Sequence, residues 1–298
     1  MKYTKPALNI SDQITTLQQR GLIISDPTIA ATYLSNISFY RLRAYTYPYQ
    51  DNTDPNHPFT DRVTFEQIIE LYNFDRKLRL LLNDAIEKIE IAFRTQIIYQ
   101  WAITHGSHWH TDPSLFRSSM HFANNLASLD KEIKRANETF LQHYSNTYTV
   151  PPTPPAWMSL EVSSFGLLSL MFHNLKRGTQ KKAVSRHFGL FDVELLENWM
   201  RCFSDIRNIC AHHSRLWNRR FTTQIDLPKK TMYPFITNNR IYPYKIYPVL
   251  CAMVYILSII NPTSTFKHQL KHLVISFPTD QIKEMGFPRD WLTEKFWQ

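Results

Sequence analysis

Apolar residues recur at steps of three and four along most of this chain, and this spacing restricts it to helices more than any other feature does. The clearest stretch runs from about Phe65 to Thr104, with an apolar stripe on one side and charged residues on the others. The stripe consists of Leu78, Leu82, Ala85, Ile89 and Phe93. Only 6 of the 298 residues are glycine, which leaves few positions for the turns of a β-sheet. The sequence therefore predicts an all-α fold.

Local signals indicate where the helices begin and end. A first helix is expected between Ser11 and Gly21, and Asp26 followed by Pro27 predicts the start of a second. The length of the stretch that begins at Phe65 predicts a break, or a pair of helices, near Asp75. Further helices are expected at about 122–144, 160–176, 192–214, 249–260 and 263–275. Asp192 is expected to cap the helix at 192–214. The apolar residues of that helix, which recur at steps of three and four, are expected to face the core; they are Val193, Leu196, Trp199 or Met200, Phe203, Ile206 and Cys210.

The same signals suggest a domain organisation. Residues 1–60 are expected to form an N-terminal helical segment packed on a helical domain at 61–298. A loop at 106–120, a polar helix after it and the prolines of 151–155 indicate an insertion at about 106–155. The proline-rich segment is stiff and cannot be helical, so it is the clearest internal boundary of the sequence.

The charge of the chain indicates an anionic partner. The formal net charge is +9, which favours nucleic acid over a membrane, although many basic proteins bind no nucleic acid. Between Lys176 and Arg220 there are ten Lys and Arg against four Asp and Glu, so two-thirds of the excess charge lies in this segment.

Other features of the sequence bear on its environment. Cys202, Cys210 and Cys251 form no CxxC pair, so neither a disulfide framework nor a zinc site is predicted, and a reducing cytoplasm fits best. The N-terminus lacks the apolar core of a signal peptide, and the longest apolar stretch, residues 247–260, is too short to span a bilayer. We expect a cytoplasmic protein that does not enter the membrane.

One short motif carries the chemistry. Arg207, Asn208 and His212 follow one another within about one and a half helical turns. An imidazole can move a proton at physiological pH, and a guanidinium can hold phosphate oxygens as charge develops on them. In a regular helix, Asp205 or Asn208 would lie beside His212 and could fix its tautomer. The alternative is that His212 only caps the C-terminus of its helix.

Basic residues and a second imidazole surround this motif in the sequence. We expect them to contact RNA phosphates, with His213 in a supporting or surface role. These candidate RNA-binding residues are Lys176, Arg177, Lys181, Lys182, Arg186, His213, Arg215, Arg219 and Arg220. Phe39, Tyr40, Tyr45, Tyr47 and Tyr49 either stack on unpaired bases or, as we favour, pack the N-terminal helices.

Other catalytic arrangements are missing from the sequence. It contains no P-loop, GxGxxG, GxSxG or HExxH motif. His105, His108 and His110 lie close together, but no carboxylate or thiolate cluster accompanies them, so we expect no metal site there. No cofactor is expected.

Several segments together resemble the Abi-like proteins of the AbiD/AbiF type, bacterial phage-defence proteins of the HEPN superfamily. They cover most of the chain from Lys5 to about Ile260. They are residues 5–8 (KPAL), 20–24 (RGLII), 40–45 (YRLRAY), 71–79 (LYNFDRKLR), 89–94 (IEIAFR), 155–158 (PAWM), 164–166 (SFG) and 207–219 (RNICAHHSRLWNR).

The resemblance implies a HEPN-type helical bundle and a metal-independent endoribonuclease toxin. It implies that Arg207 and His212 match the catalytic Arg and His of the superfamily, and that two chains pair to build the site. It also makes a structured non-coding RNA antitoxin a partner to consider beside the RNA substrate. Two other interpretations stay open: a catalytically inactive module that holds a structured RNA, and a protein that dimerises through the motif helix and acts by contact.

Overall fold

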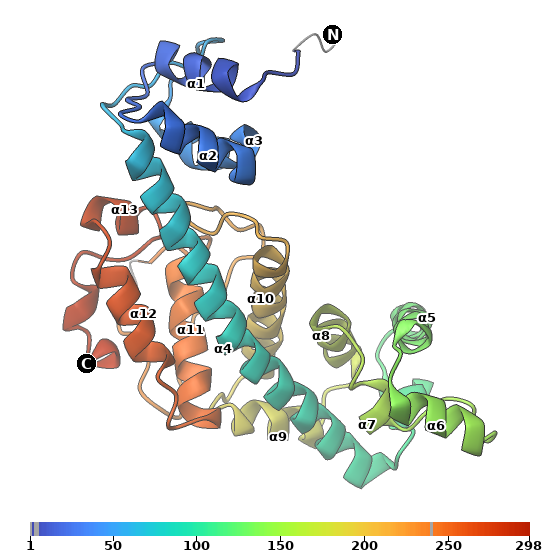
Figure 1. Ribbon diagram of the computed structural model, residues 1–298. Helices are drawn as coiled ribbons and strands as arrows, with labels where there is room; N and C mark the ends of the chain where they lie inside the picture. Colours follow the sequence, from blue (N-terminus) through green and yellow to red (C-terminus); the bar gives the residue numbers. More distant parts are fainter. Residues whose placement is uncertain (1, 3–5, 239–240) are drawn as a thin grey trace. The chain divides into compact units, whose positions relative to one another are not determined.

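The computed structural model describes residue 2, residues 6–238 and residues 241–298 (Figure 1). Lys5, the first residue of the family resemblance, lies outside the described residues. The described part of the chain forms helices and isolated β-bridges, and no β-strand occurs within it. The prediction of an all-α fold is confirmed.

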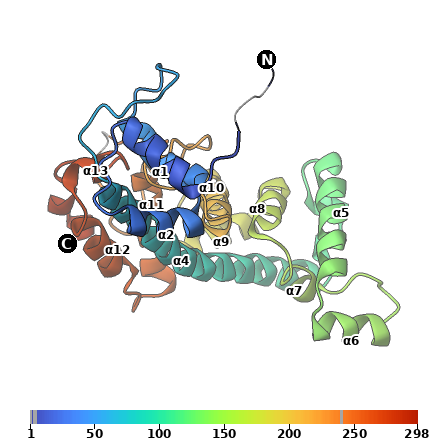
Figure 2. The same cartoon turned by 45° about the horizontal axis from the view of Figure 1, so that its top comes forward.

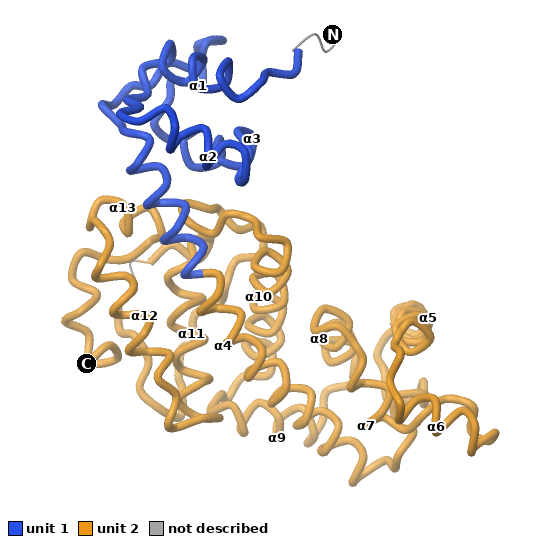
Figure 3. The backbone as a smooth tube through the Cα atoms, in the orientation of Figure 1, with its two compact units in different colours: residues 1–78 blue, residues 79–298 orange. Residues whose placement is uncertain are grey.

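The chain divides into two compact units, residues 1–78 and 79–298 (Figure 3). The first unit extends beyond residue 60 because Ile23 pairs with Thr64 and the Tyr45 hydroxyl donates a hydrogen bond to Asp75 at 2.7 Å. Pro154 and Pro155 are buried, so the proline-rich segment at 151–155 belongs within the second unit and does not divide two units.

The helices of the first unit begin where capping side chains place them. Asn9 caps the first helix, accepting a hydrogen bond from the amide of Asp12, and Asp26 caps the second, as the sequence predicts. Tyr45 is buried here, whereas Tyr40 is 84% exposed. The unit contains α1 (Ile10–Gln19), α2 (Pro27–Ile37), α3 (Phe39–Thr46), a 3₁₀ turn (Tyr47–Tyr49) and the first part of α4 (Phe65–His105).

The long helix α4 is continuous, so the expected break near Asp75 is wrong. Asp75 is fully buried, and its carboxylate is satisfied by Tyr45 without ending the helix. The predicted apolar stripe from Leu78 to Phe93 is buried throughout. In the second unit, Phe93 makes ring contacts with Phe165 and Phe172.

The second unit contains the remaining helices. They are α5 (Ser119–Arg135), α6 (Thr139–Thr147), α7 (Ala156–Ser159), α8 (Phe165–Asn174), α9 (Thr179–His187), α10 (Val193–Ala211), α11 (Ile246–Ile260), α12 (Phe266–Ile275) and α13 (Thr279–Lys283). Four 3₁₀ turns accompany them, at Trp109–Thr111, Pro113–Leu115, Trp291–Thr293 and Lys295–Trp297.

One predicted helix is divided and another is shorter than expected. The expected polar helix at 122–144 is α5 and α6, separated at residues 136–138. The expected helix at 160–176 is α8, and the short α7 precedes that range. Glu132 of α5 accepts hydrogen bonds from the amide and the hydroxyl of Ser164, the residue that caps α8. The region predicted as an insertion is thereby tied to α8.

Helix α10 lies at the centre of the second unit, packed on α8, α9 and α11 (Figures 1 and 2). Helix α11 is apolar, and its residues from Ile246 to Leu257 are all buried. The core therefore holds α10 on one side and leaves its polar face to carry the motif.

Candidate functional site

The sequence of α10 explains both its start and its orientation. The Asp192 side chain accepts a hydrogen bond from the amide of Glu194 and caps the N-terminus, as predicted. The apolar stripe is buried from Leu196 to Cys210, while Val193 at the start is only half-buried. The opposite face is polar and accessible, and it includes Arg201 and Asn208.

The C-terminus of α10 ends in a Schellman motif at the two histidines. The amide of His213 donates to the carbonyl of Cys210 at 3.0 Å, and the amide of Ser214 donates to that of Ile209 at 2.9 Å. His213 occupies the position that is usually glycine, with a φ of 54°. His212 is the C-cap residue and its side chain is exposed. The capping position and access to solvent are thus combined in one residue.

The motif residues do not make the contacts that the sequence suggested for the imidazole. The half-buried Arg207 donates from Nη1 to Oδ1 of Asn208 at 3.2 Å. Asp205 accepts a hydrogen bond from the Thr223 hydroxyl at 2.5 Å. Within the described parts of the chain, no side chain hydrogen-bonds the His212 imidazole, so the expectation that Asn208 or Asp205 fixes its tautomer is wrong. Asn208 instead orients Arg207.

Two cavities flank the polar face of α10, and Asn208 lines both. One, of about 270 Å³, lies between α10 and the segment at 219–223 and is lined by Arg219 and Arg220 as well. The other, of about 500 Å³, lies between α8 and α10 and is lined by His173 and Arg201. The Asn208 end of the motif is therefore accessible from two sides.

The segment that follows His213 is held by contacts to distant residues. Arg79 of α4, which is 4% exposed, donates from Nη1 to the carbonyl of Ser214 at 3.4 Å. The Arg219 guanidinium donates to the carbonyl of Arg215 at 3.2 Å, and that of Arg220 lies 4.0 Å from the ring centroid of Tyr244. These contacts gather cations around the end of α10.

The family of Abi-like proteins matches residues 32–218, more than half of the chain, and the match includes all of α10 and the motif. The chain belongs to the Abi-like protein family. This membership indicates a role in abortive infection, a bacterial defence against phage. No significant match was found among curated proteins or among solved structures.

In this Abi-like protein, the predicted RNA-binding residues fall into two groups. His213, Arg215, Arg219 and Arg220 lie at the C-terminal end of α10. The other group, on or before α9 and near the N-terminal end of α10, consists of Lys176, Arg177, Lys181, Lys182 and Arg186. Since α10 has 19 residues, the two ends are roughly 28 Å apart. The group on or before α9 is therefore close to the motif in the sequence but distant from it in the structure.

Lys181 does not fit its predicted role in RNA binding. Its side chain is fully buried, and the ammonium donates to Glu197 at 2.5 Å and to the carbonyl of His173 at 3.1 Å. Burial lowers the pKa of Lys181, and the hydrogen bond to Glu197 opposes that shift. Arg177 forms an ion pair with Glu194. Lys176, Lys182 and Arg186 are exposed.

Sequence reasoning missed several residues near the motif. Lys245, far along the chain, donates to Asn218 at 2.9 Å, and burial lowers its pKa, with Glu284 opposing the shift and Arg215 contributing to it. His173 of α8 contacts Glu197 through Nδ1 at 2.7 Å. A contact between α8 and α10 leaves no local pattern in the sequence. Arg201 could have been found, because the helical repeat places it on the polar face of α10.

The thiols and the histidine loop have structural surroundings. Burial, together with Asp205, raises the pKa of Cys202 to about 12, and all three cysteines are free and buried. His110 is fully buried, and burial lowers its pKa to about 4, with a smaller effect from His108. Across the described ranges, no three His, Cys, Asp or Glu residues are grouped as metal ligands.

Among the residues that the structure describes, no helix combines the length and the apolarity that a membrane crossing requires.

Proposed function

We propose that this Abi-like protein is a metal-independent endoribonuclease of the HEPN superfamily and the AbiD/AbiF type, acting as the toxin of a cytoplasmic phage-defence or toxin-antitoxin system. One observation carries the proposal. An exposed imidazole, His212, follows about one and a half turns after a guanidinium that Asn208 orients. Arg219 and Arg220 line a cavity together with Asn208. An acid-base group beside fixed positive charge is the chemistry that cleavage of an RNA phosphodiester needs.

In the proposed reaction, the ribose 2′-oxygen attacks the adjacent phosphorus as its proton is removed. The bond from phosphorus to the 5′-oxygen breaks, and that oxygen takes up a proton. The products are a 2′,3′-cyclic phosphate and a free 5′-hydroxyl. His212 transfers a proton or donates to the phosphate, and Arg207 stabilises the charge that develops on the phosphoryl oxygens.

The reaction needs one group that removes a proton and another that supplies one. A single chain offers one His in the motif, so we propose that two chains meet along this edge of α10 and that His212 of the partner subunit completes the site.

Cleavage of mixed RNA by purified protein in EDTA tests the proposal. We expect His212→Ala and Arg207→Ala to reduce the rate by about a hundredfold or more, because each removes a group that acts in the transition state. The products of the wild-type reaction should carry 2′,3′-cyclic phosphates. His143→Ala and Arg135→Ala, which change exposed residues on α6 and α5, are matched controls. Equal cleavage by all the variants would contradict the assignment.

A catalytically inactive RNA-binding module is the second candidate. It is supported by the His212 imidazole, which has no hydrogen-bonding side chain to orient it within the described residues, and by the cations at both ends of α10. In that case a structured non-coding RNA is the natural ligand. A discrete RNA species that copurifies with the protein, together with no turnover of added RNA, would favour this candidate over the nuclease.

A further inference from the structure

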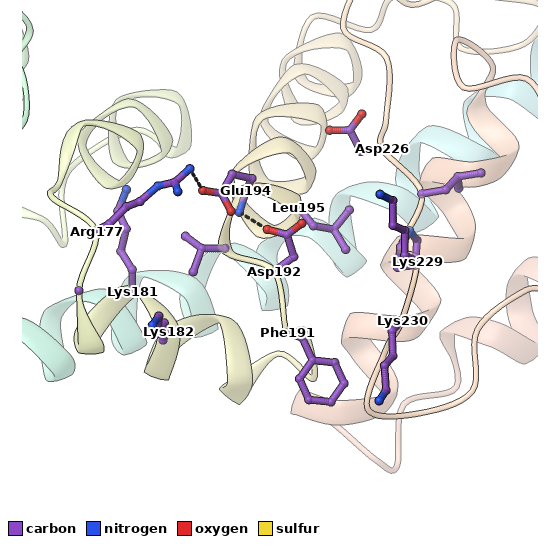
Figure 4. A pocket seen from close by; sticks show the side chains of 14 residues that line it. Arg177, Lys181, Lys182, Phe191, Asp192, Glu194, Leu195, Asp226, Lys229 and Lys230 are labelled. Atoms are coloured by element: carbon purple, nitrogen blue, oxygen red, sulfur yellow. Dashed lines mark hydrogen bonds and ion pairs between the residues drawn. The ribbon is translucent and has the colours of Figure 1, made fainter.

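A cavity of about 630 Å³ lies at the N-terminal end of α10, at the opposite end from the motif (Figure 4). Three separate parts of the chain form its walls. They are the turn into α9 with Arg177, Gly178, Lys181 and Lys182, the start of α10 from Phe191 to Leu195, and the segment from Asp226 to Lys230. Its volume is in the range of small-molecule sites and is much larger than a phosphate ion needs.

The charges that line the cavity are unevenly satisfied. Five cationic side chains face three carboxylates. Arg177 is paired with Glu194, and the buried Lys181 is paired with Glu197 outside the cavity. Asp192 accepts the amide of Glu194 as the cap of α10.

Three lysines therefore remain for a ligand. Lys182, Lys229 and Lys230 are exposed, and within the described residues no carboxylate lies at ion-pair distance from any of them. Asp226 also lines the wall, so the local charge stays positive by a small margin. These three lysines and Asp226 together attract a phosphate without forming a strongly basic surface.

An aromatic ring gives the cavity a second kind of contact. Phe191 is 50% exposed and its ring lines the cavity. The Lys230 ammonium lies 5.5 Å from its ring centroid. In Figure 4, Phe191, Lys182 and Lys230 line the lower part of the view. An aromatic surface beside lysines suits a base and its phosphate.

We propose that this cavity binds a nucleoside phosphate, with the base against Phe191 and the phosphate against Lys182, Lys229 and Lys230. The ligand is a free nucleotide or one nucleotide of an RNA chain, since both present the same groups. Along α10, the site lies roughly 21 Å from Arg207 and roughly 28 Å from His212, so it binds apart from the proposed cleavage.

The test measures binding and not cleavage, so it is independent of the proposed nuclease. Equilibrium dialysis at low salt would use AMP, GMP, CMP, UMP, inorganic phosphate and a 5′-phosphorylated oligoribonucleotide. His212→Ala protein keeps the oligonucleotide intact if the nuclease proposal is correct. Binding of a mononucleotide identifies a free-nucleotide site, and binding of the oligonucleotide alone identifies a subsite for RNA.

Two sets of variants test the assigned contacts. We expect the double variant Lys229→Ala/Lys230→Ala to weaken binding by about tenfold or more, because charge-assisted hydrogen bonds are lost. The double variant Lys131→Ala/Lys134→Ala on α5, which is also exposed, is the matched control and should bind normally. Phe191→Ala should weaken nucleotide binding but leave the binding of inorganic phosphate unchanged.

Clear outcomes would overturn the proposal. It fails if no nucleotide or oligonucleotide binds, or if the lysine double variant binds as tightly as the control. It also fails if Phe191→Ala leaves nucleotide binding unchanged or weakens phosphate binding equally. All substituted side chains are exposed, and thermal unfolding of each variant would confirm that it is folded.

Discussion

Glycine at position 213 should make the end of α10 more stable than alanine does at the same position. His213 has a φ of 54°, and its amide and that of Ser214 complete the Schellman motif. A side chain with a Cβ atom is strained in this conformation, whereas glycine adopts it freely. In the same chain, α1 ends with the same pair of hydrogen bonds at Gly21, whose φ is 99°. The position with a positive φ is therefore occupied by glycine at the end of α1 and by histidine at the end of α10.

The magnitude follows from two opposing effects. The left-handed conformation costs an L-residue about 1–2 kcal/mol. Glycine removes this cost but reduces the gain by about 0.4–1 kcal/mol, because it increases the entropy of the unfolded chain. The free energy of unfolding of His213→Gly should therefore exceed that of His213→Ala by about 1 kcal/mol, which corresponds to a Tm about 2–3 °C higher for a protein of this size.

The assay compares His213→Gly with His213→Ala in urea and thermal unfolding. Both variants lose every interaction of the imidazole, but only alanine keeps the strained Cβ. The difference between them therefore measures the backbone effect alone, and it should be about 1 kcal/mol in favour of the glycine variant. Both variants should lose the same contact with RNA, if His213 makes one.

One result would refute this reasoning. If the glycine variant is no more stable than the alanine variant, His213 does not occupy the left-handed conformation in solution. The loop that carries Arg215 and Arg219 would then leave α10 in another direction, and the arrangement of cations around the motif would have to be revised.

Two further predictions concern buried charge. Burial lowers the pKa of His110 to about 4, below its value of about 6.5 in the unfolded chain. The buried neutral imidazole therefore contributes fully to stability above pH 6.5, and this contribution is lost as the pH falls toward 4, because the unfolded chain takes up a proton first. Between pH 7 and pH 5 the wild type should lose about 2 kcal/mol more than His110→Phe in urea unfolding, and an equal loss would contradict the assignment. Lys181→Met should lower the free energy of unfolding by about 3 kcal/mol, because Glu197 is left largely buried without its ammonium partner. Lys181→Met/Glu197→Leu should recover much of this loss, and a single variant as stable as the wild type would show that the pair does not form.

The sequence predicted features that depend on neighbours along the chain. Asp26 and Asp192 act as the expected helix caps, since a cap contacts an amide only two or three residues away. The apolar stripes of α4 and α10 are buried because the helical repeat alone determines which residues share a face.

Features that depend on distant contacts were not predictable in this way. Arg79 reaches Ser214 and Lys181 reaches Glu197 because separate helices pack together, and neither pairing has a local signature. The length of the stretch that begins at Phe65 predicted a break near Asp75. The helix continues there, and the buried Asp75 carboxylate accepts a hydrogen bond from a tyrosine of another helix. The basic residues on and before α9 are near the motif in the sequence, but the full length of α10 lies between them in the structure.

The continuity of α10 also sets a size criterion for ligands. The helix contains neither proline nor glycine, so its two ends keep a fixed separation. A mononucleotide is far shorter than this separation and occupies one end without obstructing the other. Only an RNA that spans roughly 28 Å reaches both ends, so a single shorter oligonucleotide occupies one of the two sites at a time.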